Sequence, residues 1–197
     1  NAAYLILENV NVAGGKRHGI HVRNTRFLRI ENCDISGWAR DGSNNNFDAG
    51  IFLDNSSQVV VERTYFHDPR LGSNSWATGH PEGPTSILVS AGGASAHDLA
   101  GNHVIRWNDL IGSDTVRWND GIEGFDNSEI NGSFARDSDI YGNMFAFGND
   151  DMIELDGGME NVRFFHNKGL EFFTGVSVAP NRKGPSYVFN NVISRLN

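Results

Sequence analysis

The sequence predicts an all-β fold, a right-handed parallel β-helix of about six to seven coils, formed as a single domain over residues 1–197. Two repeated segments and the lack of any amphipathic helix pattern predict it. The composition agrees, because 23 glycines separate short runs of Val, Ile, Phe and Leu, which is typical of strands and turns. The main alternative fold is an antiparallel β-sandwich.

One six-residue segment recurs six times, as at residues 30–35 and 140–145, and we interpret each copy as one strand. Its fourth position holds Cys33, Thr64, Asn108, Asn143, Asn167 and Asn191. The last three lie 24 residues apart, the length of one solenoid coil without insertions. Because a side-chain amide both donates and accepts hydrogen bonds, we expect these Asn residues to bond one another up the stack.

A second repeated segment precedes the first and alternates apolar with variable residues. Its copies lie at residues 19–23, 50–54, 86–90, 121–126, 152–156 and 175–179. This period of two predicts a strand with one buried face. Each coil is therefore expected to contain a strand, a short turn, a second strand and a longer loop, with equivalent strands stacked about 4.8 Å apart.

Four irregular insertions lengthen the coils, at residues 37–48, 68–85, 91–101 and 112–119. We expect all four to follow the second strand and to form one wall of a groove. Trp118 is expected to bind substrate there, because an aromatic side chain on a loop can stack on a sugar ring. Alternatively, the aromatic side chains of these loops cover the side of the solenoid.

Charge and hydropathy restrict the partners. The formal net charge of −8 disfavours nucleic acid as a partner. No apolar run approaches the roughly 18 residues that a membrane span needs, so no membrane insertion is expected.

The single cysteine, Cys33, lies in a strand pattern and is predicted to be a buried structural thiol. Repeat-like sequence reaches both ends, which predicts a fragment of a longer helix, or end-to-end or flanking-domain packing.

Stacking the second set of segments gathers acidic side chains on one face. The predicted stripe contains Asp54, Asp120, Glu123, Asp126, Asp150, Asp151, Glu154 and Asp156. Carboxylates this close raise one another's pKa. Catalysis by one protonated and one ionised carboxyl group is one interpretation. A bound hard cation such as Ca²⁺ is a second, and a solvated acidic face with Asp in turns is the third.

Several short motifs resemble those of polygalacturonases, which are right-handed β-helix glycoside hydrolases. Residues 119–123 are similar to their Asn-Thr-Asp-Gly-Ile-Asp segment, and residues 149–153 to their Asp-Asp motif on the following coil. Residues 173–178 fall where that family carries Gly-His-Gly, with Thr174 in place of the histidine. The resemblance covers residues 119–183. It implies Asp120, Asp150 and Asp151 as the acid and base carboxylates of an inverting hydrolysis, with Arg182 or Lys183 holding a substrate carboxylate.

Together these patterns predict a glycoside hydrolase that acts on a polysaccharide or oligosaccharide, expected to be secreted or at the cell surface. The expected catalytic residues are Asp120, Asp150, Asp151, Glu154 and Asp156. The expected substrate-binding residues are Glu123, Asp126, Arg182, Lys183, Trp118 and Asp54. No cofactor is required by this chemistry, and no metal ligands are assigned, although Ca²⁺ would suit the stripe.

Two other functions stay open at this point. A polysaccharide lyase would use Ca²⁺ and a base drawn from His166, Lys168, Arg182 and Lys183. A non-catalytic glycan-binding or structural solenoid is the third function.

Overall fold

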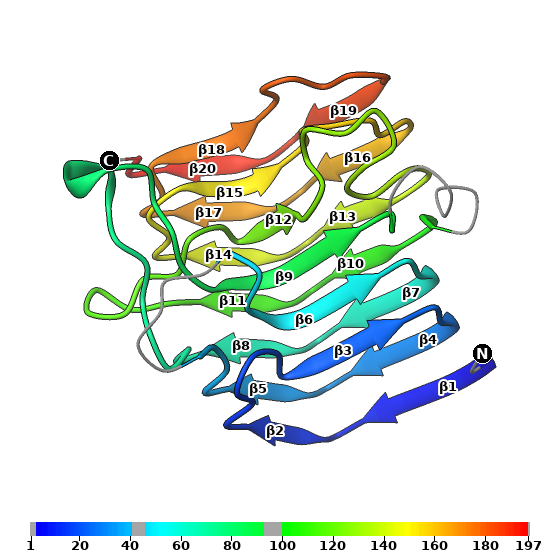
Figure 1. Cartoon of the computed structure of the whole chain (residues 1–197), viewed down its shortest axis with the longest axis horizontal. Coiled ribbons are helices and arrows are strands. Elements are labelled where there is room, and N and C mark those ends of the chain that lie inside the picture. The colour runs from blue at the N-terminus through cyan, green and yellow to red at the C-terminus, as the bar shows by residue number, and fades with distance from the viewer. Residues whose placement is uncertain (1–2, 41–45, 93–99, 197) are drawn as a thin grey trace.

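The computed structural model describes residues 3–40, 46–92 and 100–196, and it confirms the parallel β-helix (Figure 1). Three parallel sheets run along the solenoid. Sheet A contains β1 (Ala3–Glu8), β4 (Arg26–Glu31), β7 (Ser57–Glu62), β10 (Val104–Arg106), β13 (Asp139–Tyr141), β16 (Val162–Phe165) and β19 (Ser186–Phe189). Sheet B contains β2 (Asn11–Ala13), β5 (Asp34–Ser36), β8 (Tyr65–His67), β11 (Asp109–Ile111), β14 (Met144–Ala146), β17 (Lys168–Leu170) and β20 (Val192–Ser194). Sheet C contains β3 (Ile20–Arg23), β6 (Ala49–Asp54), β9 (Thr85–Ser90), β12 (Ile122–Gly124), β15 (Asp151–Glu154) and β18 (Thr174–Ser177).

Each coil contains three strands, whereas the sequence pattern predicted two. Residues 30–35, interpreted as one strand, contain the end of β4, a sharp turn and the start of β5. The turn arises at the third position of each copy, where Asn32, Trp107 and His166 have φ of 51°, 58° and 54°. A left-handed residue bends an extended chain. The apolar side chains on both sides of this turn still point inward, so the segment resembles a single strand in sequence.

The predicted Asn stack is confirmed at this turn between sheets A and B. The Nδ2 of Asn108 donates to the Oδ1 of Asn143 at 2.9 Å, and that of Asn143 donates to the Oδ1 of Asn167 at 2.9 Å. Asn167 continues to Asn191 at 3.2 Å. The same Oδ1 atoms of Asn143 and Asn167 also accept backbone N–H groups from the coil before, each at 3.0 Å. The ladder therefore satisfies buried backbone and side-chain groups together and fixes the register of adjacent coils.

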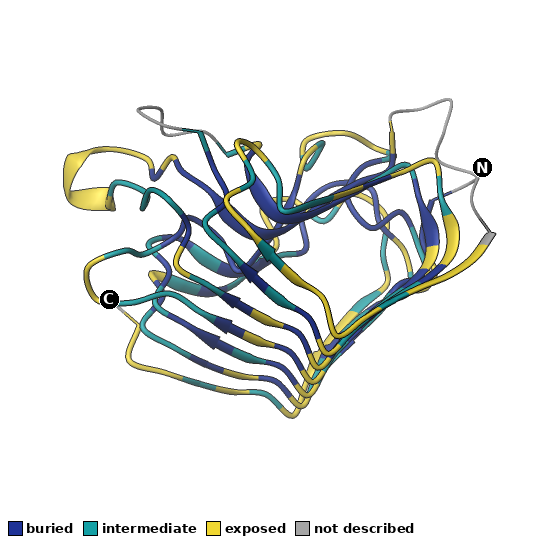
Figure 2. Cartoon of the chain, turned by 90° about the horizontal axis from the view of Figure 1, so that it is seen from below, coloured by how far each residue is buried: buried dark blue, intermediate teal, exposed yellow. Residues whose placement is uncertain are grey.

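The interior is a continuous apolar core between the three sheets (Figure 2). Equivalent side chains stack on one another, as Ile51, Ile87, Ile122 and Ile153 do along sheet C, all fully buried. Cys33 is 3% exposed, which confirms the expected buried thiol. The described part of the chain contains one short 3₁₀ helix, η1 (Trp76–Thr78), and no helix with the length and hydrophobicity that a membrane crossing requires.

Three of the four insertions leave the predicted side of the solenoid, and one does not. Residues 37–48, 68–85 and 112–119 all connect a sheet B strand to the following sheet C strand. Residues 91–101 instead follow β9 of sheet C and precede β10 of sheet A, so this insertion leaves a different corner. Its residues 93–99, and residues 41–45 of the first insertion, lie outside the described part of the chain. The three insertions on the common side place their residues at the start of the sheet C strands.

Candidate active site

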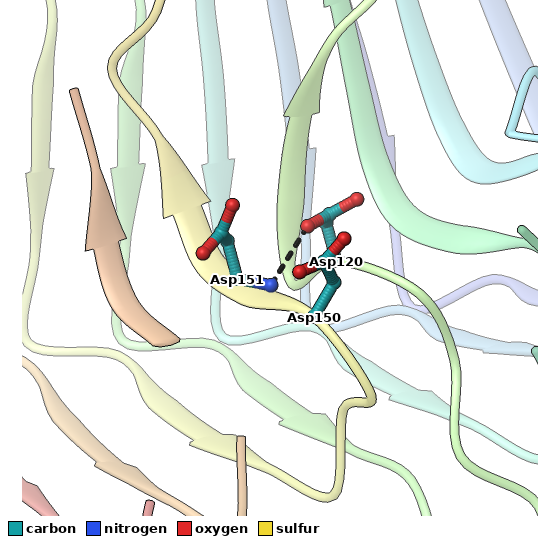
Figure 3. Close-up of side chains that lie close together, drawn as sticks. All are labelled: Asp120, Asp150 and Asp151. Carbon is teal, nitrogen blue, oxygen red and sulfur yellow. Dashed lines mark hydrogen bonds between the residues drawn. The ribbon is translucent and has the colours of Figure 1, made fainter. Parts of the chain in front are cut away.

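Three carboxylates meet at the start of two neighbouring sheet C strands. Asp120 lies just before β12, while Asp150 and Asp151 lie at the start of β15, one coil further along. The pairing of Ile122 with Ile153 sets this register. One oxygen from each of the three aspartates lies within 4.8 Å of the other two (Figure 3). We call Asp120, Asp150 and Asp151 the carboxylate cluster.

Hydrogen bonds fix two members of the cluster. The backbone N–H of Asp151 donates to Oδ1 of Asp120 at 2.9 Å, the dashed line in Figure 3. The Nδ2 of Asn119 donates to Oδ2 of Asp120 at 2.7 Å. Trp76 donates its Nε1–H to Oδ1 of Asp150 at 3.0 Å. Asp120 is thus engaged at both oxygens and is 2% exposed, whereas Asp151 is only partly buried.

Burial and mutual repulsion raise the pKa of every member of the cluster. Burial, followed by the charges of Asp150, Glu154 and Asp156, raises the pKa of Asp151 to about 7, opposed by the hydroxyl of Thr174. Burial also raises the pKa of Asp150, against the Trp76 hydrogen bond and the nearby His80.

The pKa of Asp120, the most buried member of the cluster, is shifted in the same direction. Burial and then the charge of Glu123 raise the pKa of Asp120 well above its ordinary value. Protonated carboxyl groups are therefore present in this site near neutral pH.

The acidic stripe extends from the cluster along sheet C. Glu123 and Glu154 lie side by side through the pairing of β12 with β15, as predicted. Burial raises the pKa of Glu154 to about 7, although the Gly124 N–H and Asn127 donate to its carboxylate. Glu123 is 6% exposed, and its Oε2 has no hydrogen-bond partner among the described residues. Burial and the charge of Glu154 raise its pKa well above the ordinary value.

Asp156 lies at the far end of this stripe. Its carboxylate accepts hydrogen bonds from the Ser177 hydroxyl at 2.9 Å and from the Ala179 N–H. These donors come from the next coil, so Asp156 ties two coils together. It influences the chemistry through its charge, which raises the pKa of Asp151 and Glu154.

Aromatic side chains flank the cluster on the insertion side. The rings of Trp76 and Phe173 are stacked, with centroids 5.1 Å apart, and both are about 40% exposed. They line a shallow recess together with Asn149. Trp76 lies in the insertion at residues 68–85. Its hydrogen bond to Asp150 depends on the path of this loop, which no sequence pattern predicts. The exposed rings offer an apolar surface for a sugar ring beside the carboxylates.

The structure separates the other predicted site residues from the cluster. Trp118 is fully buried and stacks on Trp38 with centroids 6.1 Å apart, so its ring belongs to the core and is not accessible to a substrate. The predicted role of Trp118 in substrate binding is therefore wrong. Its backbone forms a parallel β-bridge with Gly148 of the next coil, so the residue does not project from its loop. Asp54 and Asp126 line a separate recess further along sheet C.

The basic residues suggested for substrate or lyase chemistry also lie elsewhere. Arg182 and Lys183 follow β18 and precede β19, at the opposite end of the sheet C strands from the cluster, and Lys183 hydrogen-bonds Asn131 at 2.6 Å. His166 and Lys168 lie at the turn between sheets A and B. The structure does not bring these four residues to the carboxylates.

Comparison with known protein families and with curated protein sequences finds no match to this chain. The evidence for its chemistry therefore lies in the site itself. Carboxylate oxygens at the spacing seen here suit two uses, proton transfer between a protonated and an ionised group or coordination of a hard cation such as Ca²⁺. In the second use, Asp120, Asp150 and Asp151 would be the ligands.

Proposed function

We propose that this chain is a glycoside hydrolase that acts on a polysaccharide or oligosaccharide, with Asp151 as general acid and Asp150 as general base. One observation carries the proposal: Asp151 is partly exposed, has a pKa raised to about 7, and lies beside the more deeply buried carboxylate of Asp150. A general acid works best when its pKa is near the working pH. Glycosidic cleavage needs this asymmetry between two neighbouring carboxyl groups.

The roles follow from accessibility and hydrogen bonding. Asp151 would donate its proton to the leaving glycosidic oxygen. Asp150 is favoured in its ionised form by the Trp76 N–H and by His80, whose Nε2 lies 3.9 Å from Oδ2, so it would accept a proton from the attacking water. Asp120 is a positioning residue, because its oxygens hold the backbone of Asp151 and the side chain of Asn119.

The carboxylate spacing bears on the stereochemistry. The resemblance to polygalacturonases implies inversion, for which the carboxyl groups are usually about 6.5–9.5 Å apart. In a retaining enzyme these groups are about 5–5.5 Å apart and Asp150 would be the nucleophile instead of the base; the nearest oxygens of the cluster lie within 4.8 Å of one another. The anomeric form of the first product, measured by proton NMR, distinguishes the two routes.

The site favours hydrolysis over the lyase alternative. A lyase needs a base near the carbon beside a substrate carboxylate, and the suggested bases His166, Lys168, Arg182 and Lys183 lie away from the cluster. A strongly acidic site also repels an anionic sugar. A neutral glycan is therefore the better substrate class.

The proposal is tested by incubating the protein with a panel of neutral and uronic polysaccharides. Release of reducing ends without ultraviolet absorbance from an unsaturated product is expected. Asp151→Asn should remove this activity while the circular dichroism spectrum stays that of the parent. Full activity in Asp151→Asn, or an unsaturated product, would contradict the proposal. Glycan binding without any cleavage by the parent protein would identify a binding module instead.

A further inference from the structure

A second recess lies on the outer face of sheet C, away from the carboxylate cluster. It has a volume of about 710 Å³ and is lined by side chains of β3 and β6 together with Arg17, His18, Phe125, Asp126 and Glu129. Neither the pattern of the sequence nor the proposed chemistry assigns a role to this recess as a whole. Its lining contains three features that bear on a ligand: aromatic rings, paired charges and a neutral histidine.

The aromatic part is centred on Phe52 of β6. Its ring is stacked on His21 with centroids 5.0 Å apart and planes 7° from parallel, and it lies 5.7 Å from the ring of Phe125. Phe52 itself is 7% exposed, while Phe125 is 41% exposed. We call this site the Phe52 recess. Phe125 therefore presents an aromatic ring to solvent above a buried aromatic base, the arrangement on which a sugar ring packs.

The polar part combines charged donors and acceptors, of which Arg23 and Asp54 pair with one another. Asp54 forms an ion pair with Arg23, Nε to Oδ2 3.2 Å, and a hydrogen bond with His21, Nε2 to Oδ2 3.1 Å. Its side chain keeps 18% of its surface exposed. A paired carboxylate and guanidinium retain free lone pairs and N–H groups, which suit the hydroxyl groups of a neutral ligand.

His18 adds a neutral hydrogen-bonding group. Burial, followed by the charges of His21 and Arg17, lowers the pKa of His18 to about 4, so the ring is uncharged at neutral pH. The backbone N–H of Ala49 donates to its Nδ1 at 3.3 Å, which leaves the proton on Nε2. The recess therefore gains a donor without a further positive charge.

The recess shares one row of sheet C with Glu123, and the catalytic carboxylates lie beside this row at the start of the strands. Phe52 pairs with Leu88, and Leu88 pairs with Glu123, the acidic neighbour of the cluster. Two strand spacings of about 4.8 Å separate the Phe52 and Glu123 positions, so roughly 10 Å lies between them. Leu88 between them is fully buried, so a saccharide chain that reaches both sites passes over the residues that cover it.

We propose that the Phe52 recess is a distal subsite for one neutral pyranose unit of the saccharide chain. The sugar ring packs on Phe125, and its hydroxyl groups bond Asp54 and Arg23. The identity of this chain as the substrate rests on the proposed hydrolase function, whereas binding in the recess does not require cleavage.

The test uses calorimetric titration of the full chain carrying Asp151→Asn, which is not expected to cleave. The probes are cellohexaose, xylohexaose, mannohexaose and laminarihexaose, with hexagalacturonate as the anionic probe. Binding of at least one neutral hexamer is expected. Adding Phe125→Ala should weaken it about 10-fold, and adding Asp54→Asn should weaken it as well. Phe189→Ala is the matched control, because Phe189 is similarly exposed, at 43%, but lies on sheet A.

Each outcome separates this subsite from the proposed catalysis. If all neutral hexamers bind equally to the Phe125→Ala, Asp54→Asn and Phe189→Ala proteins, or if none binds, the subsite is refuted even when the parent hydrolyses glycans. If hexamer binding depends on Phe125 and Asp54 but the parent cleaves nothing, the subsite stands and the hydrolase proposal fails. Stronger binding of hexagalacturonate than of every neutral hexamer, lost in Arg23→Gln, would overturn the neutral ligand. Melting temperatures of all variants exclude unfolding as the cause.

Discussion

Replacing Asp151 by Asn should remove hydrolysis and, at the same time, stabilise the folded chain at neutral pH. The first effect follows from the loss of the proton donor, which typically costs about 10²–10⁴-fold in kcat. The second follows from the surroundings of Asp151, where burial and three neighbouring carboxylates raise its pKa to about 7. Asn keeps the shape and accepts the Thr174 hydrogen bond, but it carries no charge to be repelled.

The stabilisation has a definite pH dependence. The folded state holds the Asp151 proton up to about pH 7, whereas the unfolded chain releases it near pH 4. Between these values the folded state binds more protons, so the carboxyl group makes stability fall as pH rises. A shift of about 3 units at about 1.4 kcal/mol each gives an upper bound of about 4 kcal/mol. The gain in Asp151→Asn is therefore near zero at pH 4 and greatest above pH 7.

Urea unfolding at pH 4, 5.5, 7 and 8, paired with reducing-sugar assays, measures both effects on one preparation. Asp109→Asn is the control, because Asp109 is an exposed carboxylate at the start of β11 on sheet B. It should leave activity unchanged and should not reproduce the stabilisation at pH 8. If Asp151→Asn is less stable than the parent at pH 8, the electrostatic reasoning is wrong. If it retains activity, the assignment of the acid is wrong.

Three further changes test other parts of the structure. Trp76→Phe keeps a ring beside the cluster but removes the N–H that lowers the pKa of Asp150, so the acidic limb of the pH–rate profile should move to higher pH. Millimolar Ca²⁺ should bind the cluster, raise the melting temperature and inhibit hydrolysis by keeping Asp151 ionised, and EDTA should reverse all three effects. Asn143→Ala removes the Oδ1 that accepts the buried backbone and side-chain N–H groups of Asn108 and the Nδ2 that donates to the Ile105 carbonyl, so urea unfolding should show a loss of about 2–4 kcal/mol.

The stacking of the coils can be predicted from the sequence, but the number of strands in each coil cannot. The Asn column is visible because one side-chain chemistry serves every level of the ladder, as in Asn143 and Asn167. The sharp turn beside it is only partly visible, because its left-handed position holds Asn or Gly in three copies (Asn32, Gly142 and Asn190) but residues as different as Arg63, Trp107 and His166 in the others. Such residues give no Gly or Asn signal for a turn. At these positions the packing of adjacent coils, and not the local sequence, imposes the left-handed backbone conformation.

The carboxylate cluster is predictable for the same reason that the Asn column is. Asp120 and Asp151 precede equivalent strand positions, so the register alone brings them together. The aromatic contacts are not predictable in this way. Trp118 and Trp76 both lie in insertions, yet one is fully buried and the other is 41% exposed. The path of each insertion decides which ring meets the carboxylates, and it depends on packing rather than on a repeat.

The acidic site and the ladder are coupled through the register of the coils. Repulsion between Asp120 and Asp151 acts to separate two adjacent coils, since each carboxylate belongs to a different coil. Separation would break the bond from the Asp151 N–H to Asp120, and at the turn between sheets A and B it would break the bond between Asn108 and Asn143. Both bonds span the same pair of coils, so the ladder resists the displacement that the charges favour. A repeat fold with buried, register-specific hydrogen bonds can therefore hold carboxylates close enough to keep one protonated at neutral pH, which a mobile loop could not do.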